Sequence, residues 1–276
     1  MKEKDFVTKQ LSDVGGLPIG VRQDDGSLNK YFSLHDWGWK EEEDIAKIQE
    51  DRPGITAGKF VTEIMARLIK TWGPYNFDNM ETVERIVRLN QSFFADVMFA
   101  YVCLRIKSLG NKIALDITCP GCREKIKWEG DLNTLEVMTS DFDKFEDLIS
   151  RYEFESPIKL GEFNVAWIAH RPWLWHVIYN LPGGEAATAH VIRKAVFLDA
   201  VVSGEGFDDE AVVMTEDRLM TLRKIDIERI AKIIDGGQGG TDLRTPMVCP
   251  SCKHRWTAFA DWSYEVFFGQ SSLSIP

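Results

Sequence analysis

The longest nearly unbroken apolar run in the chain extends from Phe93 to Leu104 and is interrupted only by Asp96. Arg88 and Arg105 bracket the run. A helix that spans a membrane needs about 20 such residues, so this run predicts a helix buried in a protein core. The apolar spacing predicts helical segments at about 38–51, 58–72, 80–108, 172–181, 185–203 and 215–235.

Two other stretches alternate between apolar and polar residues around a short turn, which is the period of β-strands. Both turns read Cys-Pro-x-Cys, at residues 119–122 and 249–252. The apolar positions of the arms are Ile113, Leu115, Ile117, Ile126 and Trp128 around the first turn, and Met247 and Trp256 around the second. Each pattern therefore predicts a β-hairpin with two cysteines at its tip.

The two turns together have the composition of a zinc site. Two cysteines three positions apart on a hairpin tip direct both sulfurs at one ion, and two such turns complete a tetrahedral site. The sequence predicts one structural Zn²⁺ per chain, bound by Cys119, Cys122, Cys249 and Cys252. A redox dithiol is the main alternative for a Cys-x-x-Cys pair, and His254 could replace one ligand.

A shift of 130 positions maps one half of the chain onto the other without gaps over more than forty residues. The shift aligns Arg88, Leu89, Asp96 and Gly110 with Arg218, Leu219, Asp226 and Gly240, and it aligns the two cysteine turns. We therefore expect an α+β fold of two pseudo-repeats, each with a β-hairpin, helices and a zinc knuckle, joined by a shared four-cysteine site like a zinc ribbon. Chance similarity between two helix–turn–knuckle units is the alternative. The predicted parts are an N-terminal arm (1–16), a first pseudo-repeat (17–135), a linker (136–155), a second pseudo-repeat (156–262) and a C-terminal tail (263–276).

Composition narrows the possible functions. The chain has 276 residues and a net charge of -10, so a nucleic-acid role would need a local basic patch. No apolar segment follows Met1–Asp5, so we expect no secretory signal and a reducing cytosol, with Cys103 as a core residue. No His-Glu-x-x-His, Gly-x-Ser-x-Gly or Walker A motif is present, and four cysteine ligands leave no open position on a metal. The sequence therefore predicts a protein that is not an enzyme and has no small-molecule substrate. Asp96 and Asp226 are each expected to bond a backbone group or to pair with an arginine across the duplication.

Aromatic residues suggest surfaces for protein partners. Nine tryptophans are many for this length, and tryptophan is enriched at protein interfaces. Candidate partner-binding residues are Trp173 and Trp175, together with Tyr264, Phe267 and Phe268 in the tail. A tryptophan-rich core is the alternative for the first pair, and a final core strand or helix is the alternative for the tail.

The order of these motifs resembles a family of baseplate proteins from contractile-tailed phages of the T-even type, linked to the baseplate hub and tail assembly. The similar features are the opening at Leu17–Arg22, the helix at Leu89–Gly110, the strand at Ile113–Thr118 and the turn at Cys119–Cys122, with the same plan recurring from Pro157 to Cys252. The resemblance implies a non-enzymatic structural or assembly protein whose partners are other phage tail or baseplate proteins. It also implies a location in the host cytoplasm during assembly and in the tail baseplate of the virion. A zinc-ribbon accessory protein that binds nucleic acid in transcription or replication is the alternative.

Overall fold

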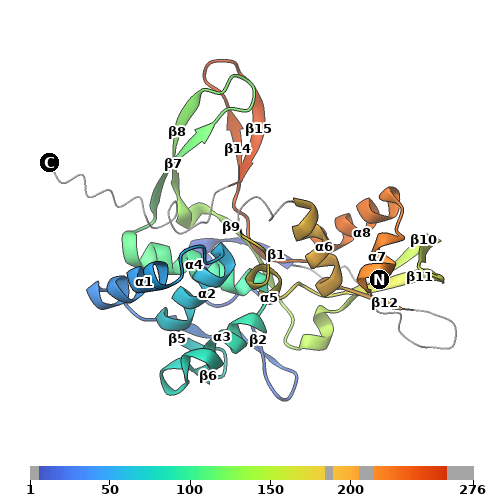
Figure 1. The fold of residues 1–276 in the computed structure, drawn as a ribbon, viewed down its shortest axis with the longest axis horizontal. Coiled ribbons are helices and arrows are strands. Elements are labelled where there is room, and N and C mark those ends of the chain that lie inside the picture. Colours follow the sequence, from blue (N-terminus) through green and yellow to red (C-terminus); the bar gives the residue numbers. More distant parts are fainter. Residues whose placement is uncertain (1–5, 184–188, 205–213, 260–276) are drawn as a thin grey trace.

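Two large clusters of buried apolar side chains and a third, smaller one organise the described chain, and a pair of β-hairpins projects away from them (Figure 1). The computed structural model describes residues 6–183, 189–204 and 214–259. Among these residues it contains eight α-helices and several small antiparallel sheets. The coarse expectation of a mixed fold of helices and strands is therefore confirmed.

Each of the six expected helical segments overlaps at least one helix, and two of the segments overlap two helices each, so eight helices are observed among the described residues. Their bounds are α1 Trp39–Asp51, α2 Ala57–Leu68, α3 Thr82–Asn90, α4 Phe94–Leu109, α5 His176–Tyr179, α6 Ala189–Ala200, α7 Glu216–Met220 and α8 Lys224–Gly236. No helix within the described residues has the length and apolar character needed to cross a membrane.

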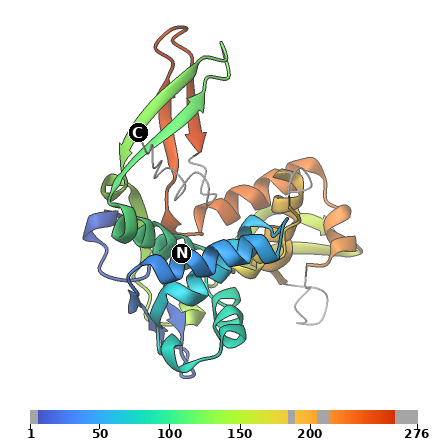
Figure 2. The same cartoon turned by 60° about the vertical axis from the view of Figure 1, so that its left-hand side comes forward.

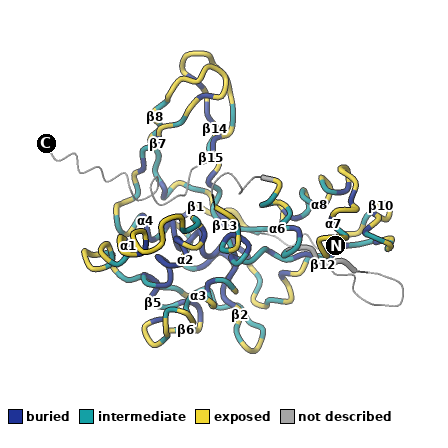
Figure 3. The backbone as a smooth tube through the Cα atoms, in the orientation of Figure 1, coloured by how far each residue is buried: buried dark blue, intermediate teal, exposed yellow. Residues whose placement is uncertain are grey.

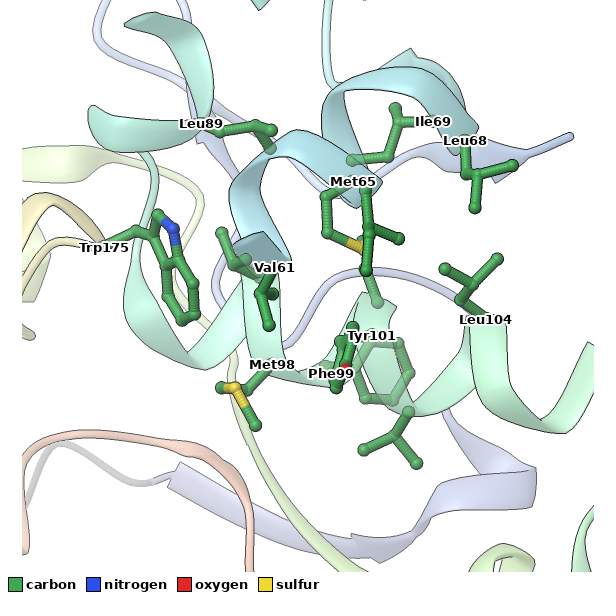
Figure 4. Packing of buried hydrophobic residues seen from close by; sticks show 14 of the residues in the cluster. Val61, Met65, Leu68, Ile69, Leu89, Met98, Phe99, Tyr101, Leu104 and Trp175 are labelled. Atoms are coloured by element: carbon green, nitrogen blue, oxygen red, sulfur yellow. The ribbon is translucent and has the colours of Figure 1, made fainter. Parts of the chain in front are cut away.

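Helix α4 is the centre of the larger apolar cluster. Ten of its sixteen residues are buried, as the apolar run predicts, and Figure 4 shows several of them packed against α2 and Trp175. The helix ends at Gly110, whose φ of 80° lies in a region that suits glycine. Asp96 is fully buried and accepts hydrogen bonds from the backbone N–H groups of Ile19 and Gly20 at 2.8 and 2.9 Å. It therefore bonds backbone groups, as expected.

The expected single helix at 80–108 is divided into α3 and α4, because the chain between them pairs with a distant segment. The carbonyl of Ser92 accepts a hydrogen bond from the N–H of Trp175 at 2.8 Å. The N–H of Phe94 donates to the carbonyl of Trp173 at 3.0 Å. These bonds use groups that a continuous helix would pair internally, so residues 91–93 leave the helix.

The strands form small sheets that join distant parts of the chain. Their bounds are β1 Phe6–Gln10, β2 Val21–Arg22, β3 Leu28–Asn29, β4 Phe32–Leu34, β5 Ile69–Trp72, β6 Tyr75–Asn76, β7 Lys112–Thr118, β8 Lys125–Asp131, β9 Glu136–Ser140, β10 Ser150–Leu160, β11 Phe163–His170, β12 Val201–Gly204, β13 Gly240–Thr241, β14 Arg244–Val248 and β15 Arg255–Phe259. Strand β9 pairs with β1 on one side and with β13 on the other. The expected N-terminal arm and linker thus contribute strands to one sheet, while the proposed division into parts stays a prediction.

The second apolar cluster lies where β10 and β11 meet the helices that follow them. Its buried members include Ile158, Ile168, Phe197 and Ile230, from β10, β11, α6 and α8. Asp226 at the start of α8 is buried and pairs with Arg223 at 2.7 Å. Arg223 lies in the same half of the chain, so this is not the expected arginine from across the duplication.

Other expected helices are shorter than their apolar patterns suggested or are divided, and the one expected at 172–181 is reduced to α5. The helix expected at 58–72 ends at Leu68, where β5 begins, and the one at 185–203 ends at Ala200, where β12 begins. The segment expected at 215–235 is divided into α7 and α8. Apolar residues continue through each boundary, so the spacing alone does not mark where a helix becomes a strand.

Candidate metal centre

Strands β7, β8, β14 and β15 form a projection that we call the stalk. Figures 1 and 2 show its two hairpins side by side, with both tips at the end far from the helices. Most of the stalk surface is exposed or half-buried, in contrast to the buried centre of the body (Figure 3). In the first hairpin Leu115 pairs with Trp128, and in the second Met247 pairs with Trp256. The alternation seen in the sequence thus gives each hairpin an apolar face, on which Leu115 and Met247 are buried.

The two tip turns follow the same backbone path. In the first knuckle, residues 119–124, the N–H of Arg123 donates to the carbonyl of Cys119, and the N–H of Cys119 donates to the carbonyl of Glu124, both at 2.9 Å. The two equivalent bonds close the second knuckle, residues 249–254, at 3.1 and 2.9 Å. Such tight closure holds both cysteines of a turn on the same side of it.

A backbone feature occurs at the same place in both knuckles. Arg123 and Lys253 have φ values of 63° and 60°, and they are the only non-glycine residues with positive φ in the part of the chain that the structure describes. A left-handed conformation is unfavourable for residues with a Cβ atom, so each turn is held in it by its surroundings. Each of these residues directly follows the second cysteine of its turn.

The turns bring four cysteine sulfurs into one group. The Sγ atoms of Cys119, Cys122, Cys249 and Cys252 all lie within 4.8 Å of one another, and all four thiols are free. The Sγ atoms of Cys119 and Cys252 are 3.7 Å apart, and those of Cys122 and Cys249 are 3.6 Å apart. Four ligands at about 2.3 Å from a tetrahedral ion would be about 3.8 Å from one another. The sulfurs therefore fit a shared metal ion, and their separations are much longer than a disulfide bond.

Electrostatics also favour a cation among these sulfurs. Desolvation opposes ionisation of Cys119, but hydrogen bonds from the N–H groups of Cys122 and Gly121 lower the pKa of its thiol to about 7. A hydrogen bond from the N–H of Glu124 favours the thiolate of Cys122, yet the neighbouring sulfurs of Cys252 and Cys249 raise its pKa to about 12. The opposite shifts of Cys119 and Cys122 show that one thiolate disfavours ionisation of its neighbour, and a divalent cation among the sulfurs would offset that repulsion.

Two neighbours of the sulfurs complete the tip. His254 is not part of the group; its ring stacks on Trp256 with centroids 5.9 Å apart and lies against Gly121. Sequence reasoning did not select Glu124, whose Oε2 lies 3.8 Å from the Sγ of Cys249. Only its place directly after the left-handed residue of the knuckle could have indicated that it points back toward the sulfurs.

The other cysteine and the candidate partner-binding residues lie elsewhere. Cys103 is half-buried on α4, where burial raises the pKa of its thiol to about 12, as expected for a core residue. Trp175 has no exposed surface, and its Nε1–H donates to Oγ1 of Thr62 at 2.7 Å, so it corresponds to the core alternative. Trp173 is half-buried and stacks on Phe94 at 4.3 Å, and its role in partner binding stays a prediction. The other candidates, Tyr264, Phe267 and Phe268, lie outside the described residues.

Comparison with known proteins adds one match. The model of the family described as T4 bacteriophage base plate protein matches residues 78–261, about two thirds of the chain. The matched part includes α3, α4, every described helix and strand from β7 to β15, and all four cysteines. No curated protein and no solved structure matches the chain. The family match spans more than half of the sequence, and the chain therefore belongs to the family of the T4 bacteriophage base plate protein.

Proposed function

We propose that this chain is a non-enzymatic structural or assembly protein of a contractile phage tail baseplate, acting through protein–protein contacts and stabilised by one structural zinc ion. The family match supports the baseplate role. The observation that carries the zinc proposal is the group of four cysteine sulfurs within 4.8 Å, contributed by two knuckles far apart in the sequence.

Zinc is the metal that suits this donor set. Four thiolates are soft ligands, and a closed tetrahedral set of four cysteines is a common structural zinc site. All four positions would be taken by Cys119, Cys122, Cys249 and Cys252, so no position is open for a substrate or an activated water. The proposed role of the ion is therefore to fix the two hairpins of the stalk to each other.

The proposed duplication explains why the ligands are so far apart. The order α3, α4, β7, β8 recurs as α7, α8, β14, β15, except that the two-residue strand β13 lies between α8 and β14. The two knuckles, offset by 130 positions, share the same hydrogen bonds. We propose that residues 17–135 and 156–262 are pseudo-repeats, with an arm before them, a linker between them and a tail after them. A crystal structure of the zinc-bound chain tests this proposal, because residues 89–132 and 219–262 should superpose after a rotation near 180°.

The proposed place of action follows from the proposed role. The protein would meet other tail or baseplate proteins in the host cytoplasm during assembly and remain in the baseplate of the virion. Cells infected by a phage that lacks the gene should accumulate incomplete baseplates, and added wild-type protein should restore their assembly. Complete baseplates that form without the protein would contradict the proposed function.

The metal has its own experiment. Native mass spectrometry of the purified chain should show one zinc ion, and Cys119→Ser or Cys252→Ser should each lower the melting temperature strongly, because zinc binding is coupled to folding. Cys103→Ser is the matched control, because Cys103 lies outside the sulfur group. Two zinc ions per chain, or none with full stability, would refute the shared site.

A further inference from the structure

A cavity of about 810 Å³ opens between the N-terminal strand, β10, the end of β11 and helix α8. Phe6, Tyr152, His170 and Ile233 line it, one from each of these elements. Cavities of this size commonly bind ligands or side chains of a partner. We call this cavity the basic pocket, for the charges described below.

A buried histidine in this pocket lacks a hydrogen-bond partner. His170 is only 5% exposed, and its Nδ1 has no partner among the described residues. Burial lowers the pKa of His170, so the ring is neutral near pH 7 and offers one donor and one acceptor. The His170 ring fits in this position because Gly237 has no side chain; a Cβ on Gly237 would lie only 2.7 Å from Cε1 of the ring. Since buried polar atoms are normally paired, Nδ1 is available for a group of a bound molecule.

The charged residues of the pocket are all cationic. Arg151, Arg229 and Lys232 line it, and no carboxylate is among its described lining residues. A guanidinium nitrogen of Arg151 lies 3.3 Å from a carboxylate oxygen of Glu153, and one of Arg229 lies 3.8 Å from a carboxylate oxygen of Asp226. Lys232 is exposed and makes no ion pair within the described part of the chain. On a chain with a net charge of -10, this concentration of positive charge favours an acidic partner.

The walls of the pocket are apolar and partly uncovered. Phe6 and Phe142 are half-buried, while Ile149 and Tyr152 are 42% and 41% exposed. Aromatic and branched apolar side chains at the mouth of a cavity, with basic groups beside them, are typical of sites that receive an anchoring side chain. The pocket therefore suits a ligand with an apolar body and a negative charge.

We propose that the basic pocket binds a segment of another baseplate protein that presents an aromatic or aliphatic side chain next to an aspartate or glutamate. The apolar side chain would enter between Phe142 and Tyr152, and the carboxylate would pair with Lys232. A hydrogen-bonding group of the segment would reach Nδ1 of His170. This inference rests on the proposed function, because it specifies the chemistry of the partner that this function requires.

The test uses the full-length, zinc-loaded chain and labelled 15-residue peptides that tile the baseplate proteins of the same phage. Fluorescence anisotropy should identify peptides that carry an acidic residue beside an apolar one. Replacing the acidic residue of such a peptide with lysine should weaken its binding at least tenfold. If no peptide binds, or if the lysine version binds equally well, the proposal is wrong.

Variants of the chain locate the binding. Lys232→Glu should weaken peptide binding about tenfold, since a favourable charge becomes an unfavourable one. His170→Phe keeps an aromatic ring, removes both nitrogens and should weaken binding several-fold. Lys70→Glu is the control, because it makes the same charge change at an exposed position on β5, and it should bind like the wild type. Circular dichroism and melting temperature show whether each variant is folded. If His170→Phe does not fold, the comparison of Lys232→Glu with Lys70→Glu alone tests the proposal.

Two further outcomes overturn the proposal. Equal affinities of Lys232→Glu and Lys70→Glu would place the peptide elsewhere on the chain. If Lys232→Glu joins the baseplate as well as the wild type does, this inference fails while the proposed function stands, whereas a wild type that joins no baseplate refutes the proposed function itself.

Discussion

Replacing Trp175 with alanine should destabilise the protein by about 3–5 kcal/mol, the range for removing a fully buried large side chain. Trp175 has no exposed surface and belongs to the cluster around α2 and α4 that Figure 4 shows. Its backbone N–H also bonds the carbonyl of Ser92 at 2.8 Å. The indole thus fixes the segment before α5 to the first helices, and alanine would leave a cavity at that junction.

Most of this cost should come from the cavity and little from the lost hydrogen bond. The indole Nε1–H donates to Oγ1 of Thr62, but the Thr62 hydroxyl itself donates to the carbonyl of Gly58 at 2.7 Å. The hydroxyl therefore keeps its own acceptor when the indole is removed, and the lost bond should cost about 1 kcal/mol. Trp175→Phe, which keeps most of the apolar contact, should then cost about 1–2 kcal/mol.

Urea denaturation of the zinc-saturated protein, followed by circular dichroism, measures these differences. The control is Trp39→Ala, because Trp39 is 89% exposed and should change the free energy of unfolding by less than about 0.5 kcal/mol. If Trp175→Ala costs no more than Trp39→Ala, the assignment of Trp175 to the core is wrong. If Trp175→Phe costs as much as Trp175→Ala, the hydrogen bond dominates and the cavity argument fails.

Three further predictions concern other parts of the chain. Burial raises the pKa of Asp96 to about 7, so the contribution of Asp96 to stability is full below about pH 4 and is lost as the pH rises through 7. In urea titrations, the stability of the wild type relative to Asp96→Asn should therefore fall between about pH 4 and pH 7. A difference that stays constant with pH would contradict this prediction. Gly130→Ala should weaken zinc retention in the presence of a chelator, because a Cβ at Gly130 would lie 2.1 Å from the Trp128 ring. The control Gly15→Ala should match the wild type, because a Cβ at Gly15 would meet no atom within 4 Å. Equal zinc retention by the two variants would refute the steric argument. Deleting residues 263–276 should unfold the protein if the tail belongs to the core, or leave it folded with zinc but unable to join its complex if the tail docks on a partner; unchanged stability and assembly would exclude both.

Local chemistry in the sequence was enough to locate the four-cysteine group. Alternation around each turn predicts a hairpin, and the Cys-Pro-x-Cys spacing places two sulfurs at each tip. The same reasoning missed the break between α3 and α4, because Ser92 and Phe94 pair with residues some eighty positions away. The basic pocket was missed for the same reason, since it forms only where His170 at the end of β11 meets Gly237 after α8. Contacts of this kind leave no periodic trace in the chain.

Each hairpin of the stalk is hydrogen-bonded to the rest of the protein at its base, near Lys112 (the first foot) and near Asp242 (the second foot). These connections determine how the loss of zinc should affect the stability of the chain. Two-stranded hairpins are marginally stable alone, so the stalk depends on its tip and on these connections. At the first foot, the guanidinium of Arg105 on α4 donates to the carbonyls of Gly110 and Lys112 at 2.7 and 3.1 Å. At the second foot, the N–H of Asp242 donates to the carbonyl of Glu136 in β9 at 2.8 Å. If the two hairpins separate without the ion, they would disturb helix α4 of the main core and the sheet of β1, β9 and β13. Losing one cysteine should therefore lower the stability of the whole chain and not only that of the tip.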